Sequence, residues 1–237
     1  MPAADIRVFA DPEALARGGA AWLCETALKS SGPFAVALSG GSTPKRLYEL
    51  LADDFVASFP WHRVHWFWGD ERCVPHDAAN SNFRMVREAM LSLAPVPAEN
   101  VHSIPTSTTP DDDAPAYERA LQRYYGAAEL DSTRPLFDVV LLGLGEDGHT
   151  ASLFPATAAL GERLHWTAAV IGAQPEARIT LTYPALESSR ETVFLVSGLA
   201  KRDILARVWR GDDVPAARLH PQGALHWFID RAADPRG

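Results

Sequence analysis

Phe34-Ala35-Val36-Ala37-Leu38 runs directly into Ser39-Gly40-Gly41-Ser42-Thr43-Pro44. The first five residues form a continuous apolar run bounded by turn-forming residues, which is typical of a parallel strand buried on both faces. Gly40 and Gly41 let the backbone turn sharply and approach a ligand, because neither carries a Cβ. The residues that follow have a helical pattern, in which we expect Thr43 to cap the helix and Pro44 to lie in its first turn. This stretch predicts a strand–turn–helix unit.

Apolar runs and helical stretches alternate along the rest of the chain. Further strands are expected at Val64–Trp68 and Phe137–Leu142, and near residues 101–104, 166–171, 178–182 and 192–196. Helices are expected at Pro12–Lys29 with Asp11 as cap, and near residues 81–91, 115–125 and 201–209, with a polar surface segment at 105–114. Strands separated by helices require crossover connections. The pattern therefore predicts an α/β fold, with a largely parallel twisted sheet flanked by helices, Rossmann-like, in a single domain spanning 1–237.

The composition describes an acidic globular chain. Its 237 residues suffice to bury a core without metal or disulfide staples, and 47% of them are hydrophobic and 22% charged, which excludes disordered and collagen-like classes. The formal net charge of −8 argues against binding to nucleic acid or to an anionic membrane, because such binding depends on clustered Lys and Arg. An anionic ligand would need a locally built positive pocket.

The sequence also predicts a reducing, non-membrane location. No segment reaches the ~18 consecutive apolar residues of a membrane span. Charged residues from Asp5 to Glu13 leave no apolar core for a signal peptide. Cys24 and Cys73 are too few and too far apart for a disulfide framework, so we expect two reduced thiols and a cytoplasmic protein.

Ligands of parallel sheets bind at the carboxyl ends of strands, which directs attention to three loops. In the first, unpaired amides at the helix start and the hydroxyls of Ser39, Ser42 and Thr43 would form an anion cradle. It is not a Walker loop, because the Gly-Lys-Ser/Thr ending is absent. A tight turn without a ligand is the alternative interpretation.

The second loop, Gly143-Leu144-Gly145-Glu146-Asp147-Gly148, matches the dinucleotide fingerprint G-x-G-x-x-G. Its context argues against a nicotinamide or flavin site, because Pro155 interrupts the following helix and no acid lies at residues 165–170, where a ribose-binding carboxylate is expected. Asp147-Gly148-His149 is more informative. Histidine suits proton transfer near neutral pH, and a nearby carboxylate can orient it. A merely hydrogen-bonded turn is the alternative.

The third loop, Gly69 to Pro75, adds Asp70, Glu71 and Arg72. Arg72 could clamp a phosphate or carboxylate in a bidentate manner, or it could pair with the two acids as scaffold. His62, His65 and His76 lack any metal-ligand spacing, so no metal is predicted, and His65 is interpreted as a packed residue.

Together these loops resemble the 6-phosphogluconolactonase family, of the glucosamine-6-phosphate isomerase-like fold. The resemblance is carried by an ordered set of motifs: residues 39–44, Asp70-Glu71-Arg72 with Val74-Pro75, Ser81-Asn82 with Met85, the run from Gly143 to Pro155, residues 178–182, and Ser197-Gly198 with Lys201. Each motif alone is weak, but their order along nearly the whole chain is specific. Residues 105–135 match nothing diagnostic.

The resemblance implies hydrolysis of 6-phospho-D-glucono-1,5-lactone to 6-phospho-D-gluconate in the oxidative pentose phosphate pathway, with no cofactor. The implied partner is this small sugar phosphate lactone. Neither nucleic acid nor a membrane is an expected partner, and the protein is expected to be a monomer or a homodimer. His149 would be the general base and Asp147 its acidic partner. The loop of Ser39, Gly40, Gly41, Ser42 and Thr43, with Arg72 and Lys201, would hold the phosphate, and Arg178 would lie close to the substrate. Either Arg72 or Arg178 could stabilise the oxyanion.

Two other functions are weighed against this one. Glucosamine-6-phosphate deaminases share the fold, but their turn carries a glutamate before the proline, where this chain has Phe154 before Pro155. Sugar-phosphate sensors of the same fold carry a DNA-binding helix-turn-helix domain, usually ahead of the effector domain. Too few residues precede Phe34 for such a domain, and the negative charge fits DNA poorly.

Overall fold

The computed structural model describes residues 4–237 and confirms the predicted α/β fold. Its main sheet has seven strands in the order β1-β10-β9-β6-β2-β3-β5, and every neighbouring pair is parallel. The strands are β1 (Asp5–Phe9), β2 (Phe34–Leu38), β3 (Val64–Trp68), β5 (Val101–His102), β6 (Phe137–Leu142), β9 (Ser189–Val196) and β10 (Ala224–Asp230). The edge strand β1 and its neighbour β10 were not predicted, because polar residues interrupt their apolar residues.

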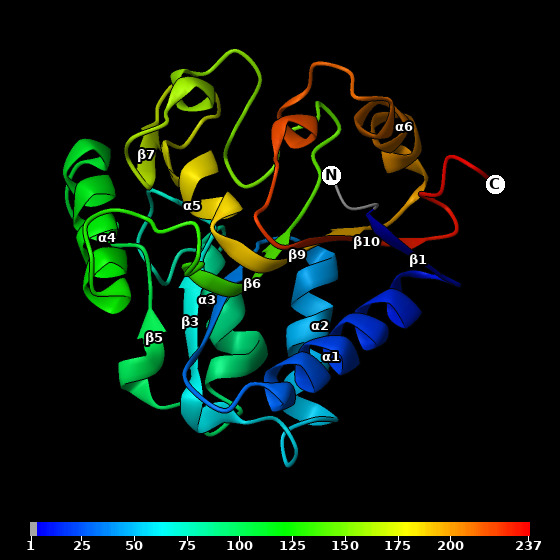
Figure 1. Cartoon of the computed structure of the whole chain (residues 1–237), viewed down its shortest axis with the longest axis horizontal. Coiled ribbons are helices and arrows are strands. Elements are labelled where there is room, and N and C mark those ends of the chain that lie inside the picture. The colour runs from blue at the N-terminus through cyan, green and yellow to red at the C-terminus, as the bar shows by residue number, and fades with distance from the viewer. Residues whose placement is uncertain (1–3) are drawn as a thin grey trace.

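Helices cover both faces of this sheet. They are α1 (Pro12–Lys29), α2 (Ser42–Asp53), α3 (Asn82–Val86), α4 (Pro110–Tyr125), α5 (Tyr183–Glu187) and α6 (Arg202–Arg210). Figure 1 shows α1 and α2 on one side of β9 and β10 and α6 on the other, with α4 beside β7. The predicted start of α1 is confirmed, since the Asp11 side chain accepts a hydrogen bond of 2.8 Å from the amide of Ala14.

A second, three-stranded antiparallel sheet lies beside the first, in the order β4-β8-β7. Its strands are β4 (Asp70–Arg72), β8 (Arg178–Leu181) and β7 (Thr167–Val170). The segment after Trp68, expected to be a loop, therefore contains a short strand. Its Asp-Glu-Arg sequence has no apolar pattern, and the strand forms because β8, far along the chain, offers it an edge.

The strand order reverses direction between β2 and β6. From β2 the chain proceeds to β3 and β5 on one side, whereas from β6 it proceeds to β9 and β10 on the other. The loops after β2 and β6 therefore diverge and leave a crevice at the carboxyl ends of two adjacent strands. This switch point is where ligands of parallel α/β sheets bind.

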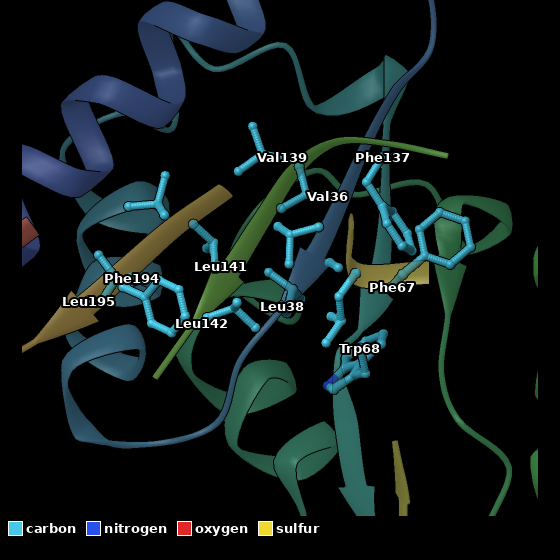
Figure 2. Packing of buried hydrophobic residues seen from close by; sticks show 14 of the residues in the cluster. Val36, Leu38, Phe67, Trp68, Phe137, Val139, Leu141, Leu142, Phe194 and Leu195 are labelled. Carbon is cyan, nitrogen blue, oxygen red and sulfur yellow. The ribbon is translucent and has the colours of Figure 1, made fainter. Parts of the chain in front are cut away.

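The central strands supply the core beneath this crevice. All five residues of β2 are buried, as the apolar run predicts. Figure 2 shows Val36 and Leu38 of β2 packed beside Leu141 and Leu142 of β6, with Trp68 of β3 close by. The glycine and polar residues that follow each apolar run mark where these strands end, and so where the loops of the crevice begin.

Two of the helix predictions need correction. The helix α4 begins at Pro110, inside the segment predicted to be a polar surface loop, and Asp113 and Ala114 are buried. Thr109 caps this helix, and Asp113 accepts hydrogen bonds from the amide and hydroxyl of Thr108. The helix predicted at 81–91 is α-helical only to Val86 and continues as a π-helical turn over Arg87–Leu91.

His226 joins three neighbouring strands at one edge of the main sheet. Its Nδ1 lies 3.1 Å from Oδ2 of Asp5 on β1, and its Nε2 lies 2.6 Å from Oε2 of Glu191 on β9. The hydrogen bond to Glu191, with that to Asp5, outweighs burial and raises the pKa of His226 above its ordinary value. The protonated ring therefore ties β1, β10 and β9 together.

We expect the free energy of unfolding to fall as the pH rises through the raised pKa of folded His226. A group whose pKa is raised by folding stabilises the protein fully below its unfolded pKa, about 6.5 for histidine, and loses that contribution above its folded pKa. His226→Gln should remove this decline of about 1 kcal/mol in the free energy of unfolding, measured by urea titration from about pH 6.5 up through the raised pKa. The exposed His62, changed to Gln, is the control. Parallel pH profiles for wild type and His226→Gln would contradict this role.

Candidate active site

A cavity of about 420 Å³ opens at the switch point between β2 and β6. Nine of the ten predicted site residues line it: Ser39, Gly40, Gly41, Ser42, Thr43, Arg72, His149, Arg178 and Lys201. Asp147 does not line this cavity, but its carboxylate contacts His149. The structure thus brings the segments after β2, β3 and β6 and the segment after β9 around one space.

The loop after β2 presents the N-terminus of α2 to the cavity. Gly41 precedes the helix with φ of 105°, a conformation that L side chains rarely adopt, and no side chain caps the helix. The prediction that Thr43 caps α2 is therefore wrong. The helix begins earlier, at Ser42, and the Thr43 hydroxyl lies 2.7 Å from the hydroxyl of Ser197 instead. The first residues of the helix, Ser42 to Pro44, line the cavity, and a helix N-terminus is suited to an anion.

Asn82 lies against this loop and was not among the predicted site residues. A Cβ on Gly40 would overlap the Asn82 side-chain amide, so only glycine fits there without displacement. The Asn82 Nδ2 donates to the Asp70 carbonyl at 2.9 Å. Asn82 thus packs the start of α3 against both the first loop and β4, a contact that no local sequence pattern indicates.

His149 and Asp147 form a hydrogen-bonded pair at the cavity wall. The ring Nδ1 lies 2.6 Å from Asp147 Oδ1, and the backbone amide of His149 donates to the same oxygen at 3.1 Å. The intervening Gly148 has φ of 86°, and its carbonyl accepts from the Ala216 amide at 2.9 Å. The Phe154 ring lies 4.5 Å from the imidazole, centre to centre. The turn therefore fixes both the position and the plane of the ring.

The electrostatics of the pair determine which ring nitrogen can act as a base. Burial acts to raise the pKa of Asp147, but hydrogen bonds from the backbone and ring of His149 hold it below its ordinary value. An ionised carboxylate only accepts hydrogen bonds, so the proton of the neutral imidazole resides on Nδ1. The lone pair is then on Nε2, the arrangement that a general base needs.

Arg72 and Arg178 face each other across the antiparallel pair β4 and β8. The Nε atoms of both guanidinium groups are buried and have no hydrogen-bond partner among residues 4–237. Burial, together with the positive charge of Arg72, lowers the pKa of Arg178. Two adjacent cations with unused donors at a cavity wall are suited to an anionic ligand.

The acids beside Arg72 have other partners. Glu71 is buried and accepts from the amides of Arg72, Asn82 and Phe83 at 2.6–2.7 Å, and burial raises its pKa. Asp70 accepts from the Ser152 hydroxyl at 2.6 Å. The guanidinium of Arg72 donates instead to the Asn80 carbonyl at 2.6 Å. The alternative in which Arg72 pairs with these acids as scaffold is therefore not observed.

Other positions complete the cavity. Lys201 lies in the 3₁₀ turn Leu199–Lys201, immediately before α6, close to the predicted helix start. Gln174, Ser197 and Phe154 also line the cavity, but were not proposed as site residues. Gln174 lies in the loop between β7 and β8, where nothing in the local sequence marks it.

The remaining histidines lie outside this cavity. His76 lies 2.9 Å from the Ile104 carbonyl and stacks on Phe83. His65 is half-buried and packed, as predicted, with its Nδ1 3.1 Å from His102 Nε2.

Within residues 4–237, no three His, Cys, Asp or Glu side chains gather as a metal-binding group would, and no helix is long and apolar enough to cross a membrane. Both cysteines are free thiols.

The fold and the geometry of the crevice agree with the comparison to known families. Residues 10–227 match the family described as glucosamine-6-phosphate isomerases/6-phosphogluconolactonase. The chain belongs to this family.

Individual relatives point to one branch of that family. A protein of Nostoc sp. named 6-phosphogluconolactonase is 44% identical over 214 residues, covering 88% of this chain and 87% of that protein. The crystal structure of 6-phosphogluconolactonase from Thermotoga maritima superposes with a TM-score of 0.84 at 30% identity, over 97% of this chain and 100% of the other. A monomeric glucosamine-6-phosphate deaminase, with a TM-score of 0.78 at 20% identity over 97% of this chain and 98% of the other, shares the fold.

Gly145→Ala should separate His149 from Asp147, because a Cβ at residue 145 would overlap Nδ1 of the imidazole. We expect ¹⁵N NMR of the ring to show the Nδ1-protonated form in the wild type and a shift toward the Nε2-protonated form in the variant. Gly161→Ala is the matched control, since a Cβ there meets nothing within 4 Å. An unchanged Nδ1–H signal in Gly145→Ala would show that the turn does not hold the ring.

Proposed function

We propose that this protein is a lactonase that hydrolyses 6-phospho-D-glucono-1,5-lactone to 6-phospho-D-gluconate, in the oxidative pentose phosphate pathway. The observation that carries the proposal is the His149–Asp147 pair, joined at 2.6 Å, at the cavity that α2 and two arginines also face. The relatives named 6-phosphogluconolactonase support the same activity.

The proposed chemistry needs a base but no nucleophilic side chain, because a lactone is an activated ester. His149 accepts a proton from water at Nε2 while the water oxygen bonds to the lactone carbonyl carbon. As the tetrahedral intermediate collapses, the bond from this carbon to the ring oxygen breaks, and the ring oxygen receives the proton from His149. Asp147 stabilises the imidazolium between these steps. The product acid then releases a proton to solvent.

The phosphate is held away from the reacting carbonyl. The amides at the start of α2, the hydroxyls of Ser42 and Thr43, and Lys201 surround one part of the cavity and suit a dianion. Holding the phosphate there orients the lactone toward His149. Arg72 and Arg178 offer their unused Nε donors to the phosphate or to the oxyanion that forms on the carbonyl.

Two observations disfavour the rival functions. Phe154 lies against His149, at the position where the resemblance places a glutamate in the deaminases. Asp5–Phe9 forms β1, which pairs with β10, and Pro12–Lys29 forms α1, which packs against α2, so both are part of the α/β fold rather than of a DNA-binding unit. The single domain, the cytoplasmic location and the monomeric or dimeric state remain predictions.

The decisive experiment is a pH-stat assay with freshly made 6-phosphogluconolactone. Acid release should exceed the spontaneous rate of ring opening, while glucosamine-6-phosphate should yield no ammonia. Acid release equal to the enzyme-free rate would overturn the proposal, and ammonia release would favour the deaminase.

His149→Ala should lower kcat by about 10²–10⁴-fold with a small change in KM, because it removes the base and leaves the phosphate contacts intact. The same pH-stat assay measures both constants, and His220→Ala, at an exposed histidine outside the cavity, is the control. Turnover near the wild-type rate would exclude His149 as the base.

Lys201→Ala should raise KM for the phosphorylated lactone about tenfold and leave kcat nearly unchanged, since it removes one charge that binds phosphate. Unphosphorylated glucono-1,5-lactone should show no such difference between the two proteins. Lys29→Ala, at an exposed lysine in the last turn of α1, controls for a general loss of charge. A KM unchanged by Lys201→Ala would refute the phosphate contact.

A further inference from the structure

Tyr48 lies in α2, the first helix after β2, and its side chain contacts the residue that follows this strand. Its hydroxyl accepts a hydrogen bond of 3.0 Å from the Ser39 amide and donates one of 2.9 Å to the Ser39 carbonyl. Tyr48 is fully buried and does not line the cavity. One phenol oxygen thus occupies both backbone groups of the residue that begins the phosphate loop.

This contact replaces a missing strand neighbour. The pairing of β2 with β6 includes Ala37 and Val140, and Ser39 lies beyond it. A buried residue past the end of a ladder would leave its N–H and C=O without partners, which is costly. Burial raises the pKa of Tyr48 above its ordinary value, so the hydroxyl keeps the proton that it donates.

The position of Tyr48 bears directly on the loop. Between the pinned Ser39 and the start of α2 lie only Gly40 and Gly41, and glycines have more conformational freedom than any other residue. Tyr48 belongs to α2 itself, so its hydroxyl fixes the strand end relative to the helix whose amides face the cavity. Without this link, binding an anion would have to order the two glycines, and affinity would fall.

The neighbouring strand ends in the same way. The Tyr117 hydroxyl of α4 accepts from the Trp68 amide at 2.9 Å and donates to the Trp68 carbonyl at 3.0 Å. Trp68 is the last residue of β3, directly before the segment that carries Arg72. Two adjacent strand ends that lead into the site are therefore each held by a buried phenol.

We infer that Tyr48 is a positioning residue for phosphate binding: by holding both backbone groups of Ser39, it keeps the glycine loop and the N-terminus of α2 in the geometry that receives the phosphate. This inference rests on the proposed lactonase function for its substrate. Tyr48, although outside the cavity, would thus affect KM by positioning the glycine loop.

Tyr48→Phe tests the inference, because it removes one oxygen and keeps the ring. We expect KM for 6-phosphogluconolactone to rise about threefold to tenfold, with kcat within about twofold of the wild-type value. KM for unphosphorylated glucono-1,5-lactone should not change. This split separates positioning of the phosphate loop from a general loss of packing, which would affect both substrates.

Tyr125 provides a matched control. Its hydroxyl also bridges two backbone groups, accepting from the Asp131 amide at 2.9 Å and donating to the Arg134 carbonyl at 2.6 Å, and it does not line the cavity. Tyr125→Phe and Tyr48→Phe should both lower the melting temperature, but Tyr125→Phe should leave both KM values unchanged. An unchanged KM in Tyr48→Phe, or an equal rise for both lactones or in both variants, would overturn the inference.

Calorimetric titration with inorganic phosphate makes the same comparison without turnover. Weaker phosphate binding by Tyr48→Phe than by wild type and Tyr125→Phe would support the positioning role, even if the wild-type protein proved inactive on the lactone. Equal binding by all three proteins would overturn it. Failure of the lactonase function and failure of the inference are thus distinguished.

Discussion

The pairing of β2 with β6 is the constraint on which the rest of the site depends. The two strands are parallel neighbours, yet the chain leaves them in opposite directions, so their carboxyl ends cannot be covered by one continuous layer of helices. The crevice is therefore a consequence of strand order. Both strands are buried over nearly their whole length, and a shift by one residue would draw a residue of the following loop into the buried layer, so these loops begin at fixed points.

The same crevice explains how a chain with a net charge of −8 can receive an anion. The positive potential is local: the amides of α2, Lys201, and two arginines paired across β4 and β8 surround one cavity. Burial, and after it the positive charge of Arg72, lowers the pKa of Arg178, so both desolvation and repulsion oppose its charged form. A bound dianion would offset that repulsion, which fits the proposed binding of a phosphorylated substrate.

What the sequence could predict follows from how local each feature is. The strands β2, β3 and β6 are continuous apolar runs, and their predicted bounds agree with the structure. The strand β4 is charged and exists only through pairing with β8, so no local pattern reveals it. Likewise, Asn82 lines the site because it packs on Gly40, and Tyr48 contacts the first loop from outside the cavity because it reaches back to Ser39; both contacts require the tertiary fold.

The glycine pattern of the second loop shows why spacing alone is a weak guide to chemistry. Its G-x-G-x-x-G match suggests a pyrophosphate, yet two of its glycines, Gly145 and Gly148, are explained by contacts within the protein. Gly145 leaves the room that the His149 ring occupies, and a Cβ on Gly148 would lie 2.7 Å from Val214, at a backbone φ of 86°. Small residues that elsewhere admit a ligand's phosphates here admit an imidazole. The fingerprint thus reports a close approach to the backbone, and the approaching group has to be identified from the surrounding side chains.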